Sequence, residues 1–170
     1  MTDFVCEPLA KHHDRSLFLC GVADLDDYLQ RRAYQDVRRR VAAVFVLVPE
    51  DQPQRIAGFY CLSSASIVLE ELPPELVRHL PRYPSVPAIL LGRLARDVNF
   101  PGVGRLLLLN ALDRSLRHSK EVAAAVVLVD AKDDHARRFY ARYGFQEVPG
   151  EGHRMFLPMK TVSDFLDADG

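Results

Sequence analysis

Residues 88–111 read AILLGRLARDVNFPGVGRLLLLNA. The segment begins as an apolar run typical of a buried strand, turns at Pro101 and two glycines, and continues into leucines at helical spacing. A helix N-terminus presents unpaired N–H groups and a partial positive charge, and glycines allow a phosphate to approach them closely. Gly102 and Gly104 therefore mark either an anion-binding turn or a plain strand-to-helix connection. Alone, they complete neither a dinucleotide fingerprint nor a P-loop.

Composition limits the classes of protein to which the chain can belong. It has 170 residues, 48% of them hydrophobic and 26% charged, which suits one globular domain over residues 1–170. The formal net charge of −1 gives no bulk attraction to nucleic acid, so such a role requires a local basic patch. Three widely spaced cysteines without a CxxC motif fit a reducing, cytoplasmic location. We identify no signal peptide and no apolar run long enough to span a membrane.

Apolar periodicity predicts alternating strands and helices, and hence the α/β (α+β) class. We expect a helix over 23–40, a turn and helix over 101–118, and a helix over 133–143. The expected strands cover residues 4–9, 41–48, 55–63, 65–69, 88–97, 123–130, 145–148 and 154–159. The proline-rich segment 72–87 is expected to be a connection with at most a short helix at 74–80.

A second pattern, RFYARYGF at residues 138–145, follows the strand expected at 123–130. Phe139 and Phe145 are typical of aromatic core packing. Tyr140 differs from them, because a buried hydroxyl needs a partner and is able to serve as an acid. The pattern therefore supplies one candidate catalytic side chain.

In order along the chain, LLGRLARD, NFPGVGRLLLLNAL, AAAVVLVD and ARRFYARYGFQEV resemble the GNAT family of acyl-CoA-dependent N-acetyltransferases, over residues 42–159. The resemblance implies a mixed sheet of six or seven strands flanked by four helices. The residues it implies in acetyl-CoA binding are Leu94, Ala95, Arg96, Gly102, Val103, Gly104, Arg105 and Phe139. The glycine turn would hold the pyrophosphate, and the strand would pair with the pantetheine and the acetyl carbonyl. Tyr140 would protonate the departing thiolate, and no metal is implied.

The glycine turn departs from the family pattern. Asn99 stands where the family has Arg or Gln, and Pro101 removes one N–H from the anion site. The turn is also shorter than in close relatives. We therefore expect pyrophosphate binding to depend more on Arg105.

The segment FLCGVADLDDYL at residues 18–29 resembles the acetyltransferase toxins of type II toxin–antitoxin systems, as do LGRLARD and MFLPMK. This resemblance implies acetylation of the α-amino group of aminoacyl-tRNA, which blocks translation. It also implies a ribbon-helix-helix antitoxin and a homodimer. One alternative is a housekeeping GNAT enzyme that acetylates a small amine or a protein terminus. The other is a non-catalytic acyl-CoA-binding or RNA-binding module.

Residues 28–42 contain five arginines and one acidic residue. The candidate tRNA-binding residues are Arg31, Arg32, Arg38, Arg39 and Arg93. Arginines seven residues apart lie near one another on a helix, and such a patch could bind RNA phosphates. A solvated helix face or an antitoxin-binding face is the alternative. Without a bulge in the strand, Arg93 and Arg96 point to opposite faces, so only one of them faces the substrate.

The expected acetyl acceptor, the α-amino group of aminoacyl-tRNA, needs little help from a general base. The pKa of a lysine side chain is about 10.4, that of an α-amine is about 8, and the ester of an aminoacyl group lowers it further. Glu70, Glu71 and Asp97 are candidate bases by location only, with solvated surface acids as the alternative. The six histidines show no metal-ligand spacing, and the pair His12-His13 is expected in an exposed loop.

Overall fold

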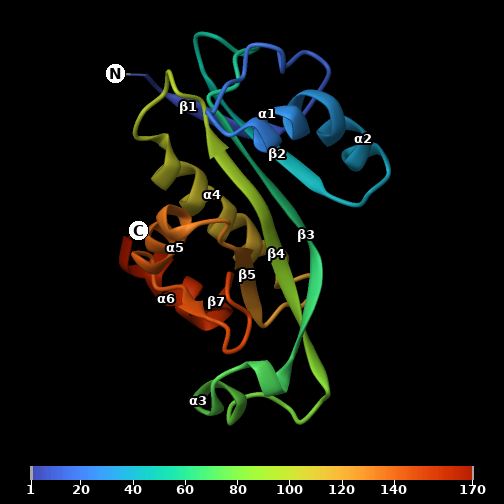
Figure 1. The fold of residues 1–170 in the computed structure, drawn as a ribbon, viewed down its shortest axis with the longest axis vertical. Helices are drawn as coiled ribbons and strands as arrows, with labels where there is room; N and C mark the ends of the chain where they lie inside the picture. The colour runs from blue at the N-terminus through green and yellow to red at the C-terminus, as the bar shows by residue number, and fades with distance from the viewer. Residues whose placement is uncertain (1, 170) are drawn as a thin grey trace. The chain divides into compact units, whose positions relative to one another are not determined.

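Figure 1 shows the fold of the chain as a computed structural model that describes residues 2–169. Within these residues, seven strands form a mixed sheet in the order β1-β2-β3-β4-β5-β7-β6, which confirms the predicted α/β class. The chain divides into two compact units, one of residues up to 63 with 92–111, the other of 64–91 with 112 onward. Three elements contribute to both: β3 (Gly58–Val68), β4 (Ser85–Arg96) and α4 (Val103–His118).

The first unit is a sheet with a helical segment. Its own elements are β1 (Phe4–Pro8), α1 (Ala23–Asp27), the turn η1 (Tyr28–Arg32), α2 (Ala33–Arg38) and β2 (Ala43–Pro49). β2 pairs antiparallel with both β1 and β3. Phe18 and Leu29 belong to one buried cluster with Val46 and Phe59 of the strands. This apolar contact anchors the helical segment on the sheet.

The helix predicted over 23–40 is interrupted by a π-helical turn. The N–H of Ala33 donates to the carbonyl of Tyr28, five residues earlier, so the helix widens by one residue. Tyr28, Leu29 and Ala33 are all buried in the same cluster. The helix ends at Arg38, and Arg40 adopts a positive φ of 58°.

The second unit contains the parallel strand pair. Its own elements are η2 (Leu69–Glu71), α3 (Pro74–Val77), β5 (Val126–Asp130), α5 (Asp134–Ala141), β6 (Gln146–Glu147), β7 (Arg154–Pro158) and α6 (Met159–Asp169). β4 runs parallel to β5 with Ala88 opposite Val126, and β5 runs antiparallel to β7. Val126, Leu128 and Phe156 form the core of this unit. The β-branched run of β5 is fully buried, as its composition predicts.

The structure differs from the sequence prediction at several boundaries. The strands expected at 55–63 and 65–69 are one continuous strand, β3. β5 begins at Val126 rather than at residue 123, although Ala125 still hydrogen-bonds to Pro87 and Met159. The C-terminal helix α6 was not predicted. No helix within residues 2–169 combines the length and apolarity needed to cross a bilayer.

Candidate active site

The glycine turn ends β4 and begins α4 within the first unit. Gly102 has a φ of 88°, a conformation that side-chain-bearing residues adopt at a cost, and α4 begins at the next residue. The amides of the first helical turn have no partner within the helix, and they follow Gly102 directly. Val103 is buried, whereas the side chain of Arg105 is exposed. The turn therefore directs the chain from β4 straight into the first amides of α4.

Asp97 holds this turn in place. Its carboxylate accepts hydrogen bonds from the N–H of Leu19 at 2.9 Å and of Asn99 at 2.8 Å. Arg55 lies 3.5 Å from the same carboxylate. Asp97 has no exposed surface, so it is neither a solvated surface acid nor a free base. Its role is to join the 17–22 loop to the start of the glycine turn.

The residues just before Asp97 are placed along β4. Leu94 is half-buried, Ala95 is buried and Arg96 is exposed. The guanidinium of Arg96 turns back toward the carbonyl of Asp97, 3.4 Å away. The first unit thus brings together the strand and turn residues that were predicted to bind acetyl-CoA.

Arg93 lies over the ring of Tyr28, with its guanidinium carbon 3.6 Å from the ring centroid. The hydroxyl of Tyr28 donates to the carboxylate of Asp36 at 2.8 Å. Burial raises the pKa of Tyr28, and it raises the pKa of the neighbouring Cys61 thiol to about 11. Both groups are therefore neutral at physiological pH, and the cation of Arg93 contacts a neutral aromatic surface.

Tyr140 lies on α5 in the second unit. Asp133 caps this helix by accepting a hydrogen bond from the N–H of Ala136 at 2.8 Å. The rings of Phe139 and Phe145 lie 5.3 and 5.4 Å from the ring of Tyr140. Burial raises the pKa of Tyr140, so its hydroxyl remains protonated and available as a proton donor.

Comparison with known proteins identifies the family. No protein-family model matches the chain. A protein of Sinorhizobium fredii described as probable toxin TacT is 32% identical over 172 residues, covering 95% of this chain and 94% of that protein. A tRNA-acetylating toxin of Mycobacterium tuberculosis is 34% identical over 151 residues, covering 88% of each. The chain belongs to the GNAT family of acetyltransferase toxins.

Solved structures of GNAT toxins share the fold. AtaT complexed with acetyl-methionyl-tRNAfMet has a TM-score of 0.89 at 25% identity, covering 96% of this chain and 99% of that one. AtaTR bound with acetyl-CoA has a TM-score of 0.84 at 25% identity, covering 96% and 98%. The agreement over nearly the full length confirms the GNAT fold predicted from the ordered motifs.

In this GNAT toxin, the predicted tRNA-binding arginines of the helical segment differ in their contacts and exposure. Arg31 forms an ion pair with Asp27 at 3.2 Å, and Arg32 lies over the Tyr28 ring at 5.5 Å. Arg38 and Arg39 are exposed and line an open hollow of about 340 Å³ together with Gln35. The simple seven-residue alignment assumes a regular α-helix, and the π-helical turn breaks that regularity.

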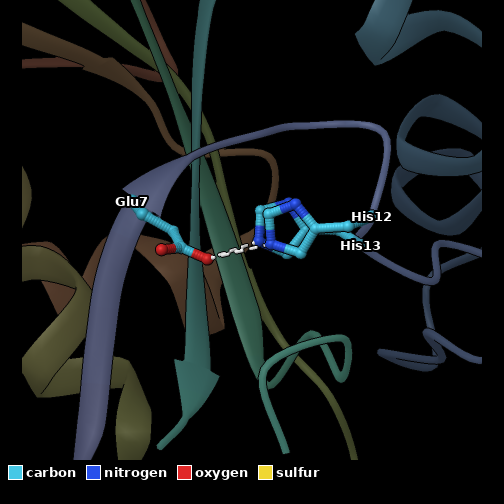
Figure 2. A group of neighbouring side chains, drawn as sticks. All are labelled: Glu7, His12 and His13. Carbon is cyan, nitrogen blue, oxygen red and sulfur yellow. Dashed lines mark hydrogen bonds and ion pairs between the residues drawn. The ribbon is translucent and has the colours of Figure 1, made fainter.

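Glu7, His12 and His13 are the one cluster within residues 2–169 whose ligand atoms are close enough for a metal ion (Figure 2). His13 is buried rather than exposed, which corrects the prediction for this residue. Its Nδ1 accepts the N–H of Ala10 at 2.9 Å, so the proton of the neutral ring is on Nε2, facing Glu7 at 2.7 Å. A metal on Nε2 would move that proton to Nδ1, against the Ala10 N–H. The geometry therefore favours a hydrogen-bonded loop.

The sequence did not predict the structural roles of two residues in this region. Tyr28 lies against Arg93, and Asp97 joins the 17–22 loop to the glycine turn. The apolar periodicity predicts that Tyr28 faces the core, but nothing local indicates that Arg93 lies over its ring. For Asp97, the only indication of a structural role in the sequence is that an acidic residue directly follows a buried strand. Glu70 and Glu71, the other acids considered, lie in η2 of the second unit.

Proposed function

We propose that the chain transfers the acetyl group of acetyl-CoA to the α-amino group of an aminoacyl-tRNA, as the toxin of a toxin–antitoxin pair. The observation that carries this proposal is the 34% identity to a tRNA-acetylating toxin over 88% of the chain. The positive φ of Gly102 and the buried hydroxyl of Tyr140 support it, because both suit the chemistry required.

In this proposal, the first unit holds acetyl-CoA. The amides of Gly102, Val103, Gly104 and Arg105 bind the pyrophosphate, and the Arg105 side chain compensates for the N–H that Pro101 lacks. The backbone of Leu94, Ala95 and Arg96 pairs with the pantetheine and the acetyl carbonyl. Phe139 contributes apolar contact to the coenzyme. Acetyl-CoA supplies an activated thioester, so no metal is needed for the transfer.

The chemistry needs one acid and a neutral amine. As the amine attacks the carbonyl carbon, a C–N bond forms and the C–S bond breaks. Tyr140 gives its proton to the departing sulfur, and the proton released by the attacking amine balances this transfer. The aminoacyl α-amine is substantially neutral near pH 7, so no side chain has to act as its base.

The proposed partners follow from this activity. Arg31, Arg32, Arg38, Arg39 and Arg93 bind the phosphates of tRNA. A ribbon-helix-helix antitoxin neutralises the toxin, which acts in the cytoplasm as a homodimer. Sedimentation analysis of the purified chain measures the homodimer. The same analysis with the candidate antitoxin, encoded by the neighbouring gene, measures the toxin–antitoxin complex.

Labelled acetyl-CoA tests the activity directly. The purified chain is incubated with total charged tRNA, with the same tRNA after deacylation, and with a mixture of peptides. We expect label only in the charged sample, on the aminoacyl group, and much less with Tyr140→Phe. Label in the peptides but not in any charged tRNA would favour a housekeeping acetyltransferase.

A further inference from the structure

Tyr28 is contacted by two arginines from different parts of the chain. The guanidinium of Arg93, on β4, lies 3.6 Å from its ring centroid, and that of Arg32, in η1, lies 5.5 Å from it. The ring is fixed from within the first unit, since it is buried, stacks on Phe59 and is hydrogen-bonded to Asp36. Both guanidinium groups therefore lie beside the same immobile ring.

The two cations are not neutralised by an ion pair. Within residues 2–169, no carboxylate forms an ion pair with Arg32 or Arg93, whereas the neighbouring Arg31 is paired with Asp27. The carboxylate of Asp36 accepts the Tyr28 hydroxyl and forms no ion pair with either arginine. Arg93 is also half-buried, so water hydrates it less well than a surface arginine. Two unpaired guanidinium groups beside one ring, one exposed and one half-buried, are a favourable setting for one phosphate.

We propose that Arg32 and Arg93 form one clamp for a single backbone phosphate of the aminoacyl-tRNA, with Tyr28 as the positioning residue that holds both arginines. This inference rests on the proposed function and makes it more specific. The five predicted arginines are then unequal: Arg32 and Arg93 act as a unit, while Arg38 and Arg39 contact RNA independently from their own hollow. The aromatic ring fixes the two guanidinium groups before binding, which lowers the entropic cost of recognising the phosphate.

A double-mutant cycle tests the clamp. The variants Arg32→Ala, Arg93→Ala and the double variant are compared in two assays: KM for charged tRNA, and binding of deacylated tRNA by fluorescence anisotropy. Each single change is expected to weaken RNA binding roughly tenfold, and the double change much less than 100-fold, because either loss already opens the clamp. The pair Arg38→Ala and Arg93→Ala is the matched control, and its effects should multiply.

Tyr28 is tested by substitutions that separate its ring from its hydroxyl. Tyr28→Phe keeps the ring and should keep the KM for tRNA within roughly twofold, whereas Tyr28→Leu should raise it roughly 3- to 30-fold. The KM for acetyl-CoA and kcat should not change. Tyr34→Leu is the control, because Arg15 lies over the Tyr34 ring at a similar 5.5 Å without belonging to the clamp.

The outcomes separate the clamp from the proposed function. If wild type acetylates no charged tRNA but the coupling between Arg32 and Arg93 persists in RNA binding, the clamp stands and the activity fails. If the effects of Arg32→Ala and Arg93→Ala simply multiply, the clamp is wrong whatever the activity. If Tyr28→Leu is unstable, the arginine cycle still decides, because Arg32 is exposed, Arg93 is half-buried and both arginine variants keep the ring.

Discussion

At the scale of single residues, Tyr140 has the most specific role in the proposed reaction. Burial raises the pKa of its hydroxyl above the ordinary tyrosine value, which keeps the proton in place for donation. We expect Tyr140→Phe to lower turnover roughly 10²–10⁴-fold, because a general acid is lost, and to leave the Kd for acetyl-CoA unchanged. Steady-state kinetics with charged tRNA and calorimetry with acetyl-CoA measure the two quantities. Unchanged turnover would remove Tyr140 from the reaction.

The acceptor amine determines the sign of the pH dependence, and Tyr140 determines where the rate stays level. The acceptor amine becomes nucleophilic as it loses its proton, and α-amines titrate at about 8 or below. Because Tyr140 remains protonated at higher pH, kcat/KM should rise from about pH 6 and stay level to about pH 9. Initial rates measured before the aminoacyl ester hydrolyses check this profile. A falling limb below about pH 9 would mean that the acid has an ordinary or lowered pKa.

Asp97 is a structural carboxylate, and its loss should appear in stability. Asp97→Asn removes the charge opposite Arg55 and leaves one of two backbone N–H groups, those of Leu19 and Asn99, without its acceptor. We expect the free energy of unfolding to fall by about 3 kcal/mol. Denaturant titration measures it. Asp113→Asn breaks an exposed pair with Arg117 and should cost less than about 1 kcal/mol; equal losses would contradict the assignment.

These residues show what the sequence could and could not predict at this scale. Tyr140 was predicted because its role depends on an ordered local motif, RFYARYGF, whose glycine, Gly144, has a positive φ. The burial of Asp97 and of His13 was not predicted, because it depends on segments distant in sequence that pack over these residues. The contact of Arg93 with the Tyr28 ring was not predicted for the same reason, since the two residues are 65 positions apart.

At the scale of elements, substitutions at the start of α4 should affect stability and acetyl-CoA binding in different ways. Gly102 has a φ of 88°, and a Cβ at this position would meet no other atom within 4 Å, so Gly102→Ala should cost about 1–2 kcal/mol through backbone strain alone. Gly104 is inside the helix, so Gly104→Ala should stabilise the fold by about 0.5–1 kcal/mol. Its methyl group should nevertheless weaken acetyl-CoA binding roughly tenfold, because it crowds the pyrophosphate.

Thermal unfolding and calorimetry with acetyl-CoA check both glycine variants. The decisive result is the opposite direction of the two effects of Gly104→Ala: higher stability with weaker coenzyme binding. If Gly104→Ala binds acetyl-CoA as tightly as wild type, the turn is a plain connection and the pyrophosphate is held elsewhere.

The elements themselves were predictable to different degrees. Helix α4 and strand β5 follow from leucine spacing and from a β-branched run, and both lie where expected. The π-helical turn at Tyr28–Arg32 was not predictable, because the apolar spacing of residues 23–40 fits a regular α-helix equally well. Helix α6 was missed because its first residue, Met159, continues the apolar run of β7 and was assigned to that strand.

At the scale of the whole molecule, the near-neutral charge has a consequence for RNA binding. The net charge of −1 provides no general attraction, so we expect the affinity for tRNA to depend on a few local arginines. Such binding is salt-dependent, with a slope set by the number of phosphates contacted. The chain therefore has to recognise tRNA through a small, organised surface, which agrees with unequal roles for its arginines.

A cell-free translation reaction tests the complete activity. Acetylation of the α-amine removes the nucleophile that an aminoacyl-tRNA needs for peptide-bond formation, so the purified chain should stop protein synthesis. Because the acetyl group comes from acetyl-CoA, arrest should require both the chain and acetyl-CoA, and Tyr140→Phe should delay it roughly 10²–10⁴-fold, in proportion to its turnover. Addition of the antitoxin before the toxin should prevent arrest. Arrest without acetyl-CoA would point to simple sequestration of tRNA, because binding alone would then account for the block.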